Sequence, residues 1–248
     1  MNEENTIKSE AFSLTLSEYK STLRLGTDAV LLSAYIRSDS TSSAVELGAG
    51  NGSISLLLAK RGAFRAIHAI EIQKELCEVM RENIAGNALD GRVIPVCADV
   101  RSIDPERFKG AKTVFANPPY MKDGCGKSSP LSSRQIARHE VFGGVSDFCR
   151  AASKILKTGG RLYLVYRPDR LETLMRALSD SGFTPKRMTF VHSDTEHSPS
   201  SVLIEATLGG GESLTVTPPL ILRNGDGYSE DYGYIYSMGR FPERFFVR

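Results

Sequence analysis

The chain has 248 residues, a length that suits one α/β domain with a sizeable core. Apolar residues are 41%, charged residues are 24%, and the net charge is +2, so the chain as a whole has no nucleic-acid-binding signature. The start is polar and the apolar runs are too short to span a membrane, so we expect a cytoplasmic protein without a membrane partner. The four cysteines show no C-x-x-C spacing, and we expect no metal site.

The first part of the chain is polar. Residues 1–25 contain short alternations, which predict a loose end and a small hairpin. The stretch GTDAVLLSAYI, residues 26–36, predicts a helix with Thr27 or Asp28 as its N-cap. We therefore expect residues 1–43 to form an N-terminal extension of hairpin and helix. Residues 44–248 would form the main domain and its C-terminal tail.

From residue 44 onward, short apolar segments alternate with helical patterns. Five segments predict strands, at residues 44–47, 66–72, 92–99, 113–119 and 160–168. The segments 185–193 and 201–209 are typical of a closing antiparallel pair. Together they predict an α/β fold with a doubly wound, mostly parallel seven-stranded sheet.

The motif VELGAGNG places three glycines between a strand and a helix: Gly48, Gly50 and Gly52. Without a Cβ, the backbone at such a turn can approach a ligand closely. In doubly wound sheets, nucleotides bind at this crevice. The spacing differs from the dinucleotide motif, because Ser53 stands where the last glycine would be. A plain strand–helix turn is the alternative.

Two acidic residues fall at the ends of the next two predicted strands. Glu71 could accept both hydroxyl protons of a ribose, and Asp99 could accept a hydrogen bond from an adenine amino group. A solvent-facing acid is the alternative for Glu71, and a helix cap is the alternative for Asp99. Both acids lie on the same sheet edge as the glycine turn, so together they predict an adenosine pocket.

The fourth predicted strand ends in NPPY, which comprises Asn117, Pro118, Pro119 and Tyr120. The side-chain oxygen of Asn117 and the carbonyl of Pro118 could accept both protons of a planar amine. Prolines stiffen this backbone and offer no competing donor. Tyr120 could stack on a base. The alternative is a β-turn with a core tyrosine.

ELGAGNG, AIEI, CADV and ANPPY, in this order, resemble the class I S-adenosylmethionine-dependent methyltransferases that modify planar nitrogens. RLGTDAVLL, ARHE and PPLILRNGDGYSEDY make the chain similar to the bacterial tRNA(Val) adenine-N6 methyltransferase family. The resemblance implies methyl transfer from S-adenosylmethionine to an adenine in tRNA. It implies base-binding or catalytic roles for Asn117, Pro118, Pro119 and Tyr120. The cofactor-binding residues that it implies are Asp28, Glu46, Gly48, Gly50, Glu71, Ile72, Asp99, Val100 and Asn117.

Two other functions remain open. A protein glutamine-N5 methyltransferase acting on release factors would use the same clamp on a side-chain amide. Those enzymes usually carry a helical domain ahead of the fold, whereas we expect only about 43 residues before the first strand here. A non-catalytic protein that binds the cofactor and RNA is the second alternative, and the intact NPPY motif speaks against it.

The surface that would contact RNA is less defined. Residues 150–187 contain nine basic and three acidic side chains, which form either a solvated face or a phosphate-facing surface. Arg134 and Arg138 lie beside the proposed base pocket and could also contact phosphates. The tail tyrosines either stack on unpaired bases or pack against the sheet; they are Tyr228, Tyr232, Tyr234 and Tyr236. The sequence leaves the oligomeric state unresolved, and we favour a monomer.

Overall fold

The structure is a computed structural model that describes residues 4–8, 13–17, 25–119, 143–225 and 227–246. Tyr120, Arg134 and Arg138 lie outside the described residues. Within the described part of the chain, no helix combines the length and the apolar character needed to cross a bilayer.

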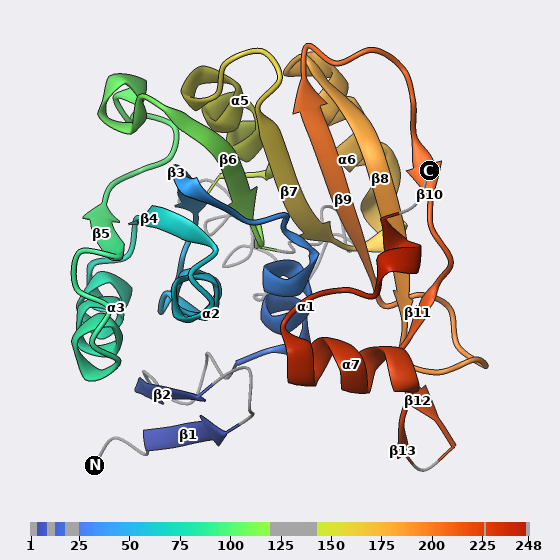
Figure 1. The fold of residues 1–248 in the computed structure, drawn as a ribbon. Coiled ribbons are helices and arrows are strands. Elements are labelled where there is room, and N and C mark those ends of the chain that lie inside the picture. The colour runs from blue at the N-terminus through green and yellow to red at the C-terminus, as the bar shows by residue number, and fades with distance from the viewer. Residues whose placement is uncertain (1–3, 9–12, 18–24, 120–142, 226, 247–248) are drawn as a thin grey trace, which may run out of the picture.

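One twisted sheet forms the centre of the molecule (Figure 1). Its strands lie in the order β10-β8-β9-β7-β6-β3-β4-β5, and β11 also pairs with β8. The strands are β3 (Asp39–Leu47), β4 (Phe64–Glu71), β5 (Val93–Cys97), β6 (Ala111–Ala116), β7 (Arg161–Tyr166), β8 (Phe183–His192), β9 (Ser201–Leu208), β10 (Thr215–Val216) and β11 (Leu220–Ile221). Strands β3 to β7 pair in parallel, and β9 is antiparallel to both neighbours. The predicted fold class is therefore confirmed, and two short strands are added to the predicted seven.

Helices cover both faces of this sheet. One face carries α1 (Thr27–Tyr35), α2 (Ser53–Lys60), α3 (Lys74–Gly86) and α7 (Glu230–Met238). The other carries α5 (Val145–Ile155), α6 (Leu171–Asp180) and the short 3₁₀ helix η1 (Pro105–Phe108). Further 3₁₀ turns are η2 (Pro168–Arg170) and η3 (Glu243–Phe245).

The sheet divides the core into two apolar layers because successive strand residues point to opposite faces. In β3, Ala44 belongs to the layer under α1 and α2, whereas Val45 and Leu47 belong to the layer under α5 and α6. All three are fully buried. This burial on both faces explains why the strands read as continuous apolar runs.

The predicted N-terminal hairpin is confirmed as β1 (Glu4–Lys8) paired with β2 (Ser13–Ser17). Asn87, which follows α3, accepts a hydrogen bond from the Thr15 N–H at 3.1 Å and donates one to the Thr15 carbonyl at 2.7 Å. Leu14 and Leu16 are buried in the layer under α1 and α2. These contacts attach the hairpin to the main domain.

Two local predictions differ from the structure, and one helix was not predicted. Helix α1 begins after Gly26, which has no side chain to cap it, so the predicted cap at Thr27 or Asp28 is wrong. Strand β3 begins at Asp39 instead of residue 44, because the Asp39 N–H already bonds to the Ala63 carbonyl. The helix that was not predicted is α7 in the C-terminal tail, where the Ser229 hydroxyl accepts from the Tyr232 N–H.

The basic segment 150–187 does not form one surface. Arg187 in β8 is only 3% exposed. Its guanidinium lies 3.0 Å from the carboxylate of Glu205 in β9, donates to the Tyr35 carbonyl at 2.7 Å and covers the Tyr35 ring at 3.6 Å. Arg187 is therefore part of the core. Arg161 also belongs to this ion-pair group, at 3.7 Å from Glu205.

Candidate active site

The glycine turn between β3 and α2 has a backbone that only glycine adopts easily. The φ angles are +69° at Gly48, +58° at Gly50 and +84° at Gly52. A Cβ at residue 48 would lie 3.0 Å from the Phe148 ring, and one at residue 52 would lie 2.9 Å from Met80 Cγ. The turn therefore combines left-handed backbone with close packing from α3 and α5.

Glu71 ends β4 directly beside this turn. One carboxylate oxygen accepts from the Gly50 N–H at 2.8 Å, and the other accepts from the Gln73 N–H at 2.9 Å. Glu71 is 5% exposed, so the solvent-facing alternative is wrong. The second oxygen also accepts a longer hydrogen bond from the Gln73 side-chain amide at 3.4 Å. The first oxygen has a further lone pair with which it can accept a ligand hydroxyl.

Glu46 lies behind the glycine turn, in β3, and is fully buried. It accepts from the Ser55 N–H at 3.1 Å and from the Ser55 hydroxyl. Helix α2 has glycine at its N-cap, so Glu46 supplies the acceptor that a capping side chain would normally give. Burial raises the pKa of Glu46 to about 8, against the lowering effect of the Ser55 hydrogen bonds.

Asn83 in α3 anchors the glycine turn, a role that was not predicted from the sequence. Asn83 in α3 is 2% exposed and donates to the Asn51 carbonyl at 3.0 Å. The Asn51 side chain in turn accepts from the Ser53 N–H at 3.3 Å and the Ser53 hydroxyl at 2.5 Å. An asparagine beside Ile84, on the otherwise apolar face of the predicted helix, was the available signal.

Asp99 follows β5 on the same edge. Its carboxylate accepts from the Arg101 N–H at 2.9 Å and from the Arg101 guanidinium at 2.6–3.0 Å. The Arg101 side chain lowers the pKa of Asp99 and keeps this acceptor ionised. The helix-cap alternative is wrong, because Asp104 is the residue that caps η1.

The remaining predicted cofactor residues lie nearby. Val100 is buried and Ile72 is half-buried. In the β4–β5 register Glu71 pairs with Cys97, and the Ala98 N–H donates to the Glu71 carbonyl at 2.9 Å. The ends of β4 and β5 therefore bring Ile72 and Val100 to the same edge as the two acids.

Asn117, Pro118 and Pro119 follow β6 at the centre of the same edge. Ala116 pairs with Leu47 of β3 on one side and with Leu164 of β7 on the other. Asn117 therefore lies one residue beyond the ends of β6 and β3, level with Gly48, while β7 continues to Tyr166. Asn117 is half-buried, Pro118 is buried and Pro119 is exposed.

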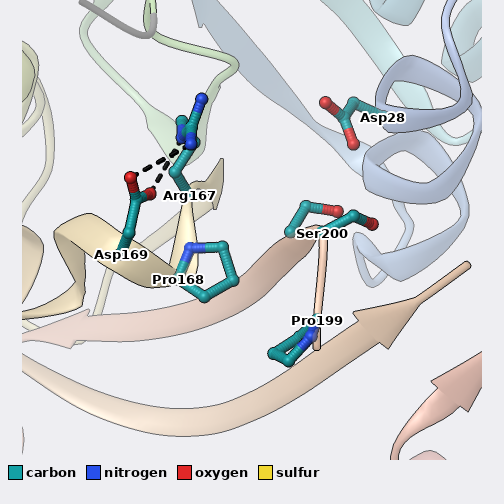
Figure 2. Close-up of a pocket in the computed structure, with 7 residues that line it drawn as sticks. Asp28, Arg167, Pro168, Asp169, Pro199 and Ser200 are labelled. Carbon is teal, nitrogen blue, oxygen red and sulfur yellow. Dashed lines mark hydrogen bonds and ion pairs between the residues drawn. The ribbon is translucent and has the colours of Figure 1, made fainter. Parts of the chain in front are cut away.

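A cavity of about 480 Å³ opens on the β7 and β9 side of this edge. It is lined by Asp28, Arg167, Pro168, Asp169, Pro199, Ser200 and Ser201. Figure 2 shows Asp28, from α1, and Ser200, just before β9, on one side, with Arg167 and Asp169 across from them. Arg167 donates to both Asp169 oxygens, at 2.8 and 3.0 Å, and lowers the pKa of Asp169.

The sequence pattern of the methyltransferase small domain family matches residues 20–181, which include the glycine turn and the NPP segment. The chain belongs to the methyltransferase small domain family. It is a methyltransferase that uses S-adenosylmethionine.

Curated relatives align with this methyltransferase over most of its length. A protein from Porphyromonas gingivalis, named tRNA1(Val) (adenine(37)-N6)-methyltransferase, is 30% identical over 74% of each chain. A protein with the same name from Parabacteroides distasonis is 28% identical over 75% of this chain and 77% of its own length. Another from Tolumonas auensis is 26% identical over 85% of this chain and 86% of its own length. The predicted family resemblance is confirmed.

Solved structures show the same fold at low identity. A crystal structure described as a predicted O-methyltransferase from Agrobacterium tumefaciens has a TM-score of 0.67 and 23% identity, and the match covers 87% of this chain and 97% of that one. TYW2 of M. jannaschii in complex with AdoMet has a TM-score of 0.55 and 17% identity, with 84% and 86% covered.

The residues of the methyltransferase fit S-adenosylmethionine. The glycine turn presents main chain that no Cβ shields at Gly50, and the Glu71 carboxylate lies against that turn with acceptor capacity for hydroxyls. Asp99 is an ionised acceptor at the end of the next strand. Among the described residues, no group of three or more His, Cys, Asp or Glu has an arrangement that could hold a metal ion.

Proposed function

We propose that this methyltransferase transfers a methyl group from S-adenosylmethionine to the N6 amine of an adenine in tRNA. The observation that carries the proposal is the position of Asn117. It lies between the glycine turn, at the end of β3, and the cavity beyond the end of β7. A methyl donor bound at the glycine turn and a base bound in the cavity would meet at the Asn117 amide.

The cofactor half of the proposal uses the acids on the first side. Glu71 accepts from the ribose hydroxyls and Asp99 accepts from the adenine amino group of the cofactor. Ile72 and Val100 pack against its adenine. Asp28 in the cavity wall lies near its methionine end, and Gly48 and Gly50 let the main chain approach it closely. Glu46 bonds to Ser55 in the first turn of α2 and so fixes the start of the helix that follows the glycine turn.

The substrate half uses the NPPY residues. The Asn117 side-chain oxygen and the Pro118 carbonyl accept the two protons of the N6 amine, which turns its lone pair toward the methyl group. Pro118 and Pro119 keep this backbone rigid and carry no N–H that could compete. Tyr120 stacks on the target base.

The chain's contribution to chemistry is alignment and charge stabilisation. The bound sulfonium supplies an electrophilic methyl group. Asn117 and Pro118 would hold the amine in line for displacement of this methyl group from sulfur, and the proton that the amine loses would pass to water. The oxygens of Asn117 and Pro118 stabilise the positive charge that grows on the amine. The names of the curated relatives support adenine in tRNA as the substrate class.

The substitution Asn117→Ala tests this assignment. We expect turnover to fall by about 10²–10³, the usual cost of removing one preorganised partner of developing charge. Cofactor affinity, measured by calorimetry, should change far less than turnover, because Glu71 and Asp99 are untouched. A matching loss of turnover and of cofactor affinity would count against a substrate-orienting role for Asn117. Parallel assays with a release-factor peptide would reveal a glutamine-N5 activity instead.

A further inference from the structure

The hairpin that precedes α7 carries an exposed aromatic side chain on the site's own edge of the sheet. It consists of β12 (Arg223–Asn224) and β13 (Gly227–Tyr228). Figure 1 places it with α7 at the lower edge, the edge toward which β6 and β7 run. Tyr228 at the end of this hairpin is 65% exposed.

Tyr234 is half-buried, and the other two described tail tyrosines are held in or against the core. Tyr232 is 7% exposed within the core, and Tyr236 packs partly buried against the same layer. For these two, packing is the correct alternative. Tyr228 contacts the Tyr232 ring, with centroids 5.0 Å apart in an edge-to-face arrangement, but stays 65% exposed. Its exposure is therefore not explained by the core.

The main chain that carries Tyr228 is nevertheless fixed by hydrogen bonds, and Arg223 lies near its ring. Arg223 lies directly across the hairpin from Tyr228, and its guanidinium is 5.9 Å from the ring centroid. The Ser229 N–H donates to the Leu222 carbonyl at 2.9 Å. Leu222 in turn donates to the carbonyl of His192, the last residue of β8. An aromatic ring fixed in this way loses little conformational freedom when a ligand stacks on it.

The hairpin is also connected to the wall of the cavity. The Arg223 N–H donates to the Ser193 carbonyl at 3.0 Å. Ser193 begins the loop that ends at Pro199 and Ser200, which line the cavity. The hairpin that carries Tyr228 is therefore joined by a main-chain hydrogen bond to the loop that forms part of the cavity wall.

We propose that Tyr228, together with Arg223, is a stacking platform for an unpaired base of the RNA substrate. The identity of the RNA rests on the proposed function. A base whose amine is methylated must leave its stack, so the neighbouring nucleotides are single-stranded and offer free faces. A tyrosine ring takes any of these faces, and a guanidinium can bind the adjoining phosphate. The platform contributes to RNA affinity and takes no part in methyl transfer.

Three variants test the platform: Tyr228→Ala, Tyr228→Phe and, as a control, Val216→Ala. Val216 is another exposed apolar residue, 58% exposed, on β10 beside Met188 and away from the hairpin. Unmodified tRNA affinity is measured by fluorescence anisotropy at fixed salt, together with KM, kcat and cofactor affinity. We expect Tyr228→Ala to raise the Kd and KM for tRNA about 5- to 100-fold. Tyr228→Phe and Val216→Ala should match the wild type.

The outcomes separate this inference from the proposed function. Wild-type tRNA affinity in Tyr228→Ala overturns the platform, whatever the activity is. A loss in both Tyr228→Ala and Tyr228→Phe that accompanies a lower melting temperature shows a structural role and also overturns it. Tyrosine-dependent RNA binding without methyl transfer by the wild type supports the platform and refutes the proposed function. Absence of RNA binding by the wild type refutes both.

Discussion

The buried carboxyl of Glu46 predicts that stability depends on pH in a definite direction. Burial raises its pKa to about 8, above its ordinary value of 4.5. The folded chain therefore holds a proton, between these two values, that the unfolded chain has released. The contribution of the protonated Glu46 carboxyl to the free energy of unfolding is fully present below pH 4.5 and is lost as pH rises through about 8. The substitution Glu46→Gln removes the titrating group and keeps an oxygen that can accept from Ser55.

The magnitude follows from the same two values. The interval from 4.5 to about 8 spans 3.5 pH units. At ~1.4 kcal/mol for each unit, the loss is at most about 5 kcal/mol across the interval. Between about pH 5 and about pH 8, the unfolding free energy of the wild type should therefore fall by ~4 kcal/mol relative to Glu46→Gln.

Urea denaturation at several pH values, at constant ionic strength, measures this difference. Other groups titrate in the same range. The pKa of His68 is lowered, mainly by burial, and that of His197 is raised by Asp194. Both are present in each protein, so the difference between the two curves isolates Glu46. If the two proteins lost stability in parallel from about pH 5 to about pH 8, Glu46 would be ionised in the folded state and the reasoning would be refuted.

Two further predictions concern packing. Gly48→Ala should destabilise the fold by about 1–3 kcal/mol and weaken cofactor binding, because the residue has φ +69° and its Cβ would meet Phe148. Gly62→Ala is the control, since it has φ +66° with open space around a Cβ; equal effects of the two in thermal melts and calorimetry would rule out the contact. Arg187→Ala should cost about 3–5 kcal/mol in urea denaturation, because it leaves Glu205 with only the longer contacts to Arg37 and Arg161. A loss below about 1 kcal/mol, the usual value of a surface pair, would contradict it.

The sequence pattern predicted the sheet because its parallel strands are buried on both faces. Val45 and Leu47 read as a strand for this reason, and the glycines after them read as a turn that needs left-handed backbone. The acids at the ends of β4 and β5 could be placed on one edge, since consecutive parallel strands end together. These features depend on local pattern and on topology alone.

The features that were missed depend on partners distant in the chain. Arg187 reads as a surface cation until the β8–β9 register sets it opposite Glu205 and Tyr35 covers it. Asn83 reads as one polar residue in a helix until α3 packs beside the glycine turn. The sequence predicts Asp99 as an acceptor for an adenine amino group or as a helix cap, but not its bond to Arg101, which depends on the conformation of that turn. Such contacts follow from tertiary placement, which periodicity does not encode.

Incubation of the purified protein with labelled S-adenosylmethionine and unmodified bulk tRNA, followed by digestion to nucleosides, tests the central claim most directly. We predict label in N6-methyladenosine, and its loss in Asn117→Ala. Absence of label from tRNA under conditions in which the cofactor binds, or label in a nucleoside other than N6-methyladenosine alone, would contradict the account.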